Sequence, residues 1–101
     1  MTGAEYDWTV PADHPAFAGH FPARPIVPGV VLLDRAILFA EAMLGTSGLN
    51  WRVGNAKFFS PVGPEEALTF ALSTSPRGAI TFTVRAGERD IASGSLTRAV
   101  P

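Results

Sequence analysis

Residues 28–44, with the sequence PGVVLLDRAILFAEAML, decide how the rest of the chain must fold. Proline suits the first position of a helix, because its missing N–H would find no partner in the first turn. Gly45 and Gly48 supply the stop, since glycine readily adopts the left-handed conformation that ends many helices. The sequence therefore predicts one helix from Gly29 to about Leu44, roughly 24 Å long at about 1.5 Å per residue.

Apolar side chains point in nearly every direction around this helix. They are Val30, Val31, Leu32, Leu33, Ala36, Ile37, Leu38, Phe39, Ala40, Ala42, Met43 and Leu44. A helix that is apolar on all sides and lies in water must be surrounded by protein. Asp34, Arg35 and Glu41 interrupt the apolar run, which makes it a poor membrane span. Of these, Glu41 is expected to reach the helix end or its rim.

One strand-like segment precedes the helix and four follow it. Tyr6, Trp8 and Val10 alternate with polar residues, as in a half-buried strand. Residues 12–27 have a loop-like composition. The later segments are about residues 51–59, 67–74, 79–85 and 90–98. Short turns between adjacent strands predict antiparallel hairpins.

One curved antiparallel sheet around one central helix satisfies these segments, and that α+β architecture is the hotdog fold. A second copy of the chain would cover the remaining helix face and a free sheet edge. At 101 residues the chain is one domain, spanning 1–101. Its hydrophobic share of 47% suggests more apolar surface than a small domain covers alone, which favours a homo-oligomer.

Composition excludes several classes of function. The formal net charge is -1, without a basic run, so nothing favours nucleic-acid binding. The sequence contains no cysteine, which excludes disulfides and thiolate metal sites. The first residues lack the pattern of a signal peptide, and a cytoplasmic protein without a membrane span is expected.

Residues 19–30, GHFPARPIVPGV, place His20 on a loop stiffened by prolines and lead directly into the helix. This segment resembles the active-site signature of the 3-hydroxyacyl-acyl-carrier-protein dehydratases of the FabA/FabZ type. Asp34, fourteen positions after His20, falls where that family keeps its acidic residue. Residues 58–68, FFSPVGPEEAL, resemble a second family segment, typically Pro-Val-x-Pro-Gly-Asp-x-Leu. The resemblance covers about residues 6–98 and is closest to the small stand-alone dehydratases of the aryl-polyene type.

The resemblance implies dehydration of (3R)-3-hydroxyacyl thioesters to trans-2-enoyl thioesters in fatty-acid or polyene biosynthesis. His20 would take the proton next to the thioester carbonyl, a task that suits an unperturbed pKa of about 6.5. Asp34 would orient or protonate the leaving hydroxyl, and we expect its apolar neighbours to favour its protonated form by desolvation. The Gly29 amide, or that of Val30, would polarise the carbonyl, because the first amides of a helix lack partners and the helix dipole is positive there.

The family also implies an acyl carrier protein as partner and a homodimer with shared sites. In such a dimer, His20 of one chain and Asp34 of the other would serve one substrate. Candidates for the wall of an acyl tunnel are Phe21, Leu38, Phe58 and Phe59. Candidates for carrier docking are Arg24 and Lys57. No metal and no organic cofactor are expected, because the substrate itself carries phosphopantetheine from the carrier protein.

Each assignment has an alternative. The aromatic side chains could be plain core or interface, and the two basic ones could be solvated surface residues. Asp34 could be a structural acid paired with an arginine. Leu38 stands where many family members have a glutamine that helps to position the acid. For the whole chain, the alternatives are a hotdog acyl-thioesterase and a non-catalytic acyl-binding or partner subunit.

Overall fold

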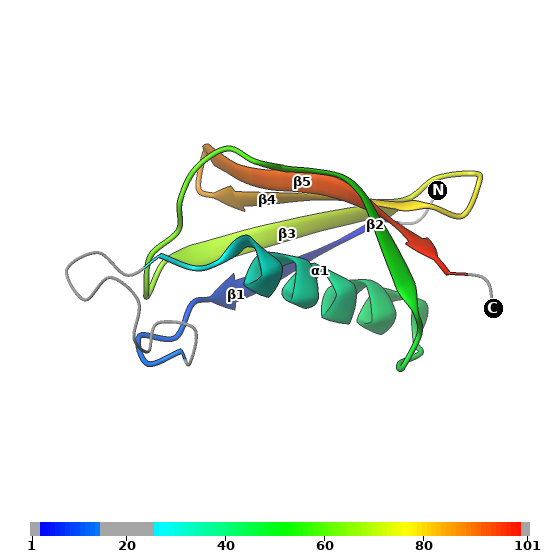
Figure 1. The fold of residues 1–101 in the computed structure, drawn as a ribbon, viewed down its shortest axis with the longest axis horizontal. Coiled ribbons are helices and arrows are strands. Elements are labelled where there is room, and N and C mark those ends of the chain that lie inside the picture. The colour runs from blue at the N-terminus through cyan, green and yellow to red at the C-terminus, as the bar shows by residue number, and fades with distance from the viewer. Residues whose placement is uncertain (1–2, 15–25, 100–101) are drawn as a thin grey trace.

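A five-stranded antiparallel sheet carries one helix along its face in the computed structural model, which describes residues 3–14 and 26–99 (Figure 1). In chain order the elements are β1 (Gly3–Thr9), α1 (Gly29–Leu44), β2 (Trp51–Phe58), β3 (Ala67–Thr74), β4 (Ile80–Ala86) and β5 (Arg89–Arg98). The strand order is β1-β3-β4-β5-β2, and each neighbouring pair is antiparallel. This is the predicted α+β hotdog arrangement.

The helix has the predicted bounds, Gly29–Leu44. Pro28 has extended backbone angles, φ -61° and ψ 145°, so it caps the helix instead of forming its first residue. At the other end, Gly45 takes a left-handed φ of 73° and donates its N–H to Ala42 O. A residue with a β-carbon would be strained there, which explains why glycine ends the helix.

The strands match the predicted segments to within one residue at most ends. Burial alternates along β4, where Ile80, Phe82 and Val84 face inward and the intervening residues are exposed. Neighbouring side chains of a strand point to opposite faces of a sheet, so this alternation places one apolar face against the helix. The β3–β4 and β4–β5 connections are hairpins, as predicted, whereas β2 crosses over to pair with β5.

The core lies between α1 and the inner face of the sheet. The helix contributes small or medium side chains there, Leu32, Ala36 and Ala40. The sheet contributes larger ones, of which Phe70 and Phe82 are among the largest that are fully buried. Each fully buried large side chain stabilises the fold by about 1.5–3 kcal/mol. The small side chains of the two alanines allow the helix to lie close to the strands.

The far end of the helix is tied to β2 by a buried carboxylate. Glu41 is 8% exposed, and its Oε2 accepts hydrogen bonds from Leu49 N at 3.0 Å and from Trp51 Nε1 at 3.1 Å. This confirms that Glu41 reaches the helix end. A buried carboxylate needs such donors, because an unpaired charge in the core is costly.

The outward face of α1 is covered by no other described part of the chain. Val30, Asp34 and Leu38 lie four residues apart along this face, and Val30 and Leu38 are 60% and 51% exposed. Within the described residues, the expectation that protein encloses the helix is thus met on one side only. Among residues 3–14 and 26–99 there is no helix with the length and apolar content that crossing a membrane requires.

Candidate active site

A pocket of about 390 Å³ opens at the beginning of α1. Among the described residues, its wall consists of two segments that are distant in sequence: Ile26, Val27, Gly29 and Leu32 from one, and Phe58, Phe59, Ser60, Pro61 and Val62 from the other. Both segments are those that the sequence singled out, one at the helix start and the other after β2. The fold therefore brings the described end of the first resembling motif, residues 26–30, to the same place as the second motif.

The ring of Phe58 lies directly against Gly29. A β-carbon at Gly29 would come within 2.8 and 2.9 Å of two ring carbons of Phe58, closer than real contacts allow. Any side chain at this position would therefore have to displace the Phe58 ring, which favours glycine although it is a poor helix former. Phe58 and Phe59 are 50% and 56% exposed, so the pocket has an apolar rim that the chain itself does not cover.

The helix start beside this ring carries backbone donors. Val31 N donates to Pro28 O at 3.0 Å, closing the first turn. No side chain of the described residues caps the helix, and its first turn holds no acidic residue. The amides of Gly29 and Val30 precede any intrahelical partner, and a helix N-terminus carries roughly half a positive charge. This end of the pocket can therefore polarise a carbonyl oxygen.

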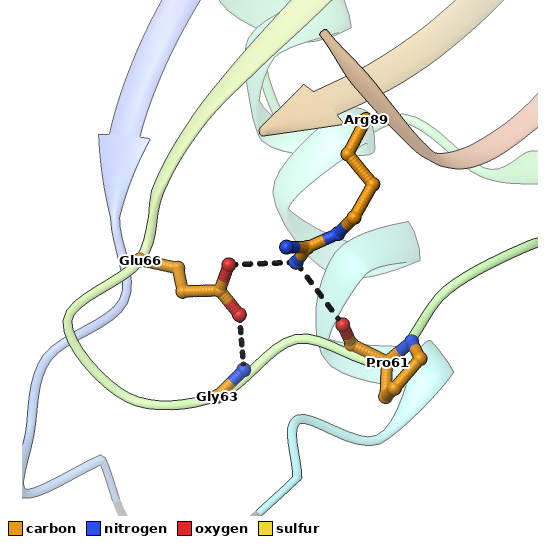
Figure 2. Close-up of polar contacts among 4 residues, drawn as sticks. All are labelled: Pro61, Gly63, Glu66 and Arg89. Atoms are coloured by element: carbon orange, nitrogen blue, oxygen red, sulfur yellow. Dashed lines mark hydrogen bonds and ion pairs between the residues drawn. The ribbon is translucent and has the colours of Figure 1, made fainter. Parts of the chain in front are cut away.

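An ion pair between Glu66 and Arg89 contacts the backbone of Pro61, a residue of the pocket wall (Figure 2). Arg89 Nη2 lies 2.6 Å from Glu66 Oε1 and also donates to Pro61 O at 3.3 Å. The other oxygen of Glu66 accepts from Gly63 N at 2.8 Å. Donation by the Gly63 amide lowers the pKa of Glu66 most strongly; burial opposes this, and Arg89 lowers the pKa further.

The residue before this carboxylate has an unusual backbone. Glu65 has a φ of 65°, in the left-handed region, at the position where the family segment typically has glycine. Its N–H donates to Val10 O at 2.7 Å, and Val10 N donates to Glu66 O at 3.0 Å. The left-handed turn thus joins the segment after β1 to the entry of β3.

Asp34 lies on the outward face of α1, away from the pocket of its own chain. It is exposed on the outward row of α1 and is not part of the pocket that Gly29 lines. The prediction that its apolar neighbours bury it is wrong for the chain alone. Leu32 and Ala36, on the opposite side of the helix, face the sheet instead. Leu38 shares the outward row with Asp34, so this chain does not bring it to Phe58 and Phe59 either.

The remaining predicted residues are distributed as follows. Lys57 is exposed and lines a separate hollow with Thr83 and Ser93. His20, Phe21 and Arg24 fall outside the described residues. The roles assigned to these four residues stay predictions.

Sequence reasoning missed the contacts that Glu66 and Arg89 make with the pocket wall. Glu66 carried a usable signal, because it occupies the position of the aspartate in the family segment. Arg89 carried none, since it looked like any surface arginine. Its partner lies 23 residues away in sequence, and only the paired strands bring the two together.

Comparison with known proteins supports the resemblance. A family model described as ApeI-like, ApeI dehydratase, matches residues 1–95. The 3-hydroxyacyl-[acyl-carrier-protein] dehydratase FabZ of Chlamydia trachomatis serovar L2 is 34% identical over an alignment 101 positions long, and the match covers 87% of this chain. The chain spans 66% of the length of that relative.

Solved structures share the fold. A chain of the dehydratase heterocomplex ApeI:P from Xenorhabdus doucetiae matches with a TM-score of 0.84 and 22% identity, covering 97% of this chain and 88% of that one. A probable thioesterase from Bartonella henselae matches with a TM-score of 0.74 and 16% identity, covering 98% and 90%. Proteins named for different reactions thus share this architecture, so the residues of the site must distinguish them.

Proposed function

The chain belongs to the ApeI-like dehydratase family, and we propose that it removes water from 3-hydroxyacyl thioesters carried by an acyl carrier protein. The observation that carries the proposal is the helix start of α1, where the Gly29 amide meets an apolar pocket. The 34% identity to a FabZ dehydratase supports the same reaction class.

The reaction would proceed by proton transfer around the bound thioester. His20 takes the proton next to the carbonyl, and the Gly29 amide stabilises the negative charge that develops on the carbonyl oxygen. The electron pair of the broken C–H bond forms the C=C bond. The C–O bond breaks as Asp34 gives a proton to the hydroxyl, which leaves as water. Both side chains then exchange their protons with solvent.

A second copy of the chain would supply Asp34 to this pocket. In the single chain Asp34 is exposed and does not line the pocket. Val30 and Leu38 flank it with apolar surface, and surface of this kind marks contact sites. Strand β2 ends the strand order and pairs with β5 among the described residues, so its outer edge is available for pairing. A homodimer with shared sites accounts for all three observations.

In the same dimer, other residues would contact the acyl chain and the carrier protein. Phe58 and Phe59, both half exposed on the pocket rim, would contact the acyl chain, and Leu38 of the second copy would extend that surface. Arg24 and Lys57 would attract the carrier protein or the phosphate of its phosphopantetheine. No metal or organic cofactor takes part in this chemistry.

A direct assay tests the reaction. The wild-type protein is incubated with a panel of 3-hydroxyacyl-carrier-protein thioesters, and the acyl-carrier mass is followed. We expect the loss of one water with the thioester intact, and a decrease of about a hundredfold or more in rate for His20→Ala. Release of the carrier thiol would instead identify a thioesterase, and binding without turnover would identify an acyl-binding subunit.

A further inference from the structure

Backbone hydrogen bonds hold both ends of the loop between β2 and β3, which forms part of the pocket wall. Phe59 N donates to Ile91 O at 2.8 Å at the beginning of the loop. Glu65 and Glu66 are bonded to Val10 at its end. Between these hydrogen bonds, residues 61–63 belong to no strand, so their position depends on other contacts, and residues 61 and 62 line the pocket.

The side chains of Arg89 and Glu66 provide those contacts (Figure 2). The same nitrogen of Arg89 reaches both Glu66 and Pro61 O, while the second oxygen of Glu66 holds Gly63 N. The two side chains thereby fix a carbonyl and an amide two residues apart. Each of these backbone bonds has a charged partner, which makes it stronger than a neutral hydrogen bond.

The pocket wall in turn positions the two residues that precede α1, Val27 and Pro28, which we call the entrance of α1. Val27 N donates to Val62 O at 2.8 Å, directly between the two atoms that the ion pair fixes. Val27 is buried and immediately precedes Pro28 and the helix start. A displacement of Val62 would therefore move the residues that carry the Gly29 amide.

We infer that Glu66 and Arg89 are positioning residues of the pocket, which hold the wall at residues 61–63 and, through Val62 and Val27, the entrance of α1. The ion pair itself is partly exposed, with side-chain exposures of 47% for Arg89 and 31% for Glu66. Exposed pairs contribute little to global stability. The effect of the Glu66–Arg89 pair is local, because its further hydrogen bonds go to the backbone of residues 61–63.

The inference has a consequence for substrate binding, and that consequence rests on the proposed function. Residues 61 and 62 line the pocket but bring no reacting group to it. Loosening them weakens the binding of the acyl chain and also shifts the Gly29 amide, which stabilises the charge on the carbonyl oxygen. The expected result is a rise in KM together with a fall in kcat.

Arg89→Met tests the inference, because it keeps the aliphatic stem and removes both donated bonds. Arg85→Met is the matched control. Arg85 lies in the adjacent strand and pairs with Asp90 at 3.1 Å, and its backbone bonds go to Gly87 and Glu88, away from the pocket. Glu66→Asp is the conservative variant, since a carboxylate at this position can still accept from the Gly63 amide.

Amide hydrogen exchange tests, without any substrate, whether Arg89 holds the pocket wall and the entrance of α1. In Arg89→Met, the amides of Val27 and Gly63 should exchange at least tenfold faster than in the wild type. The core amides of Phe70 and Val84 should stay within about twofold, and Arg85→Met and Glu66→Asp should resemble the wild type at all four positions. Unchanged exchange at Val27 and Gly63 in Arg89→Met, or an equal change in Arg85→Met, overturns the inference.

Kinetics with a 3-hydroxyacyl-carrier-protein thioester add the functional part. Arg89→Met should lower kcat/KM at least fivefold, through a higher KM and a lower kcat, whereas Arg85→Met should change neither. An active wild type whose kcat/KM is unaffected by Arg89→Met contradicts the positioning role. A wild type without dehydratase activity overturns the proposed function instead, and the exchange experiment still decides the inference.

Discussion

The two ends of α1 are built in opposite ways. At the C-terminal end, the Gly45 and Thr46 amides bond to helix carbonyls, and Glu41 binds two further donors. At the N-terminal end, no described side chain caps the helix, and an aromatic ring and a pocket adjoin Gly29. One end is satisfied by the chain itself and stabilises the fold. The other leaves its first amides without a side-chain partner among the described residues.

The two glycines at these ends give the sharpest test of the contrast. Gly29→Ala should lower kcat/KM about a hundredfold, because the added methyl group displaces the Phe58 ring and hinders approach to the amide. Its free energy of unfolding should change by no more than about 1 kcal/mol, since alanine favours the helix. The measurements are dehydration kinetics and urea unfolding.

Gly45→Ala should show the reverse pattern. A β-carbon there meets nothing within 4 Å, but the φ of 73° strains any other residue. We expect a loss of about 1 kcal/mol in stability with unchanged kinetics. If both substitutions affected stability alone, the functional difference between the two helix ends would be refuted.

Glu41→Ala probes the closed end of the helix. The substitution leaves the donors of Leu49 and Trp51 without their acceptor, which should lower the free energy of unfolding by about 2 kcal/mol. Chemical denaturation measures this loss. A change below about 0.5 kcal/mol would mean that the carboxylate does not hold this end together.

Glu65→Gly probes the turn that leads from the pocket wall into β3. Because Glu65 has a φ of 65°, glycine should relieve strain and raise the free energy of unfolding by about 1 kcal/mol. Thermal and urea unfolding of the two proteins provide the comparison. A destabilised variant would show that the Glu65 side chain contributes more than its backbone strain costs.

The smallest expected effect is a dependence of stability on pH. The pKa of Glu66 is lowered from its usual 4.5, so its contribution to stability is fully present above that pH and is lost as the pH falls through the lowered pKa. The difference in unfolding free energy between the wild type and Glu66→Gln should therefore be at most about 1 kcal/mol at pH 7 and should shrink below pH 4.5. A difference that stays constant down to pH 3 would contradict the assignment.

Local signals in the sequence were sufficient for the elements themselves. Pro28 and Gly45 delimit the helix, and period-two alternation delimits β4. Non-local features could not be read in the same way. The pairing of β2 with β5 joins segments about 40 residues apart, and the bulge of β2 depends on Asn55 in a left-handed conformation.

The site was predicted in part for the same reason. The motifs at the helix start and after β2 do meet at one pocket. The apolar pattern alone could not predict which side of α1 carries Asp34 away from the sheet, because a helix that is apolar all round does not reveal which side faces its own sheet. The contacts of Arg89 depend on strand pairing, which no local pattern encodes.

In the proposed dimer, one active site combines the helix start at Gly29 of one copy with Asp34 of the other. The most direct measurement mixes a His20→Ala chain with an Asp34→Ala chain, each inactive by itself, and follows water loss from a 3-hydroxyacyl-carrier-protein thioester. With exchange of subunits verified by mass, the account predicts that activity returns, because half of the sites in a mixed dimer retain both groups. No recovery of activity in verified mixed dimers would contradict it.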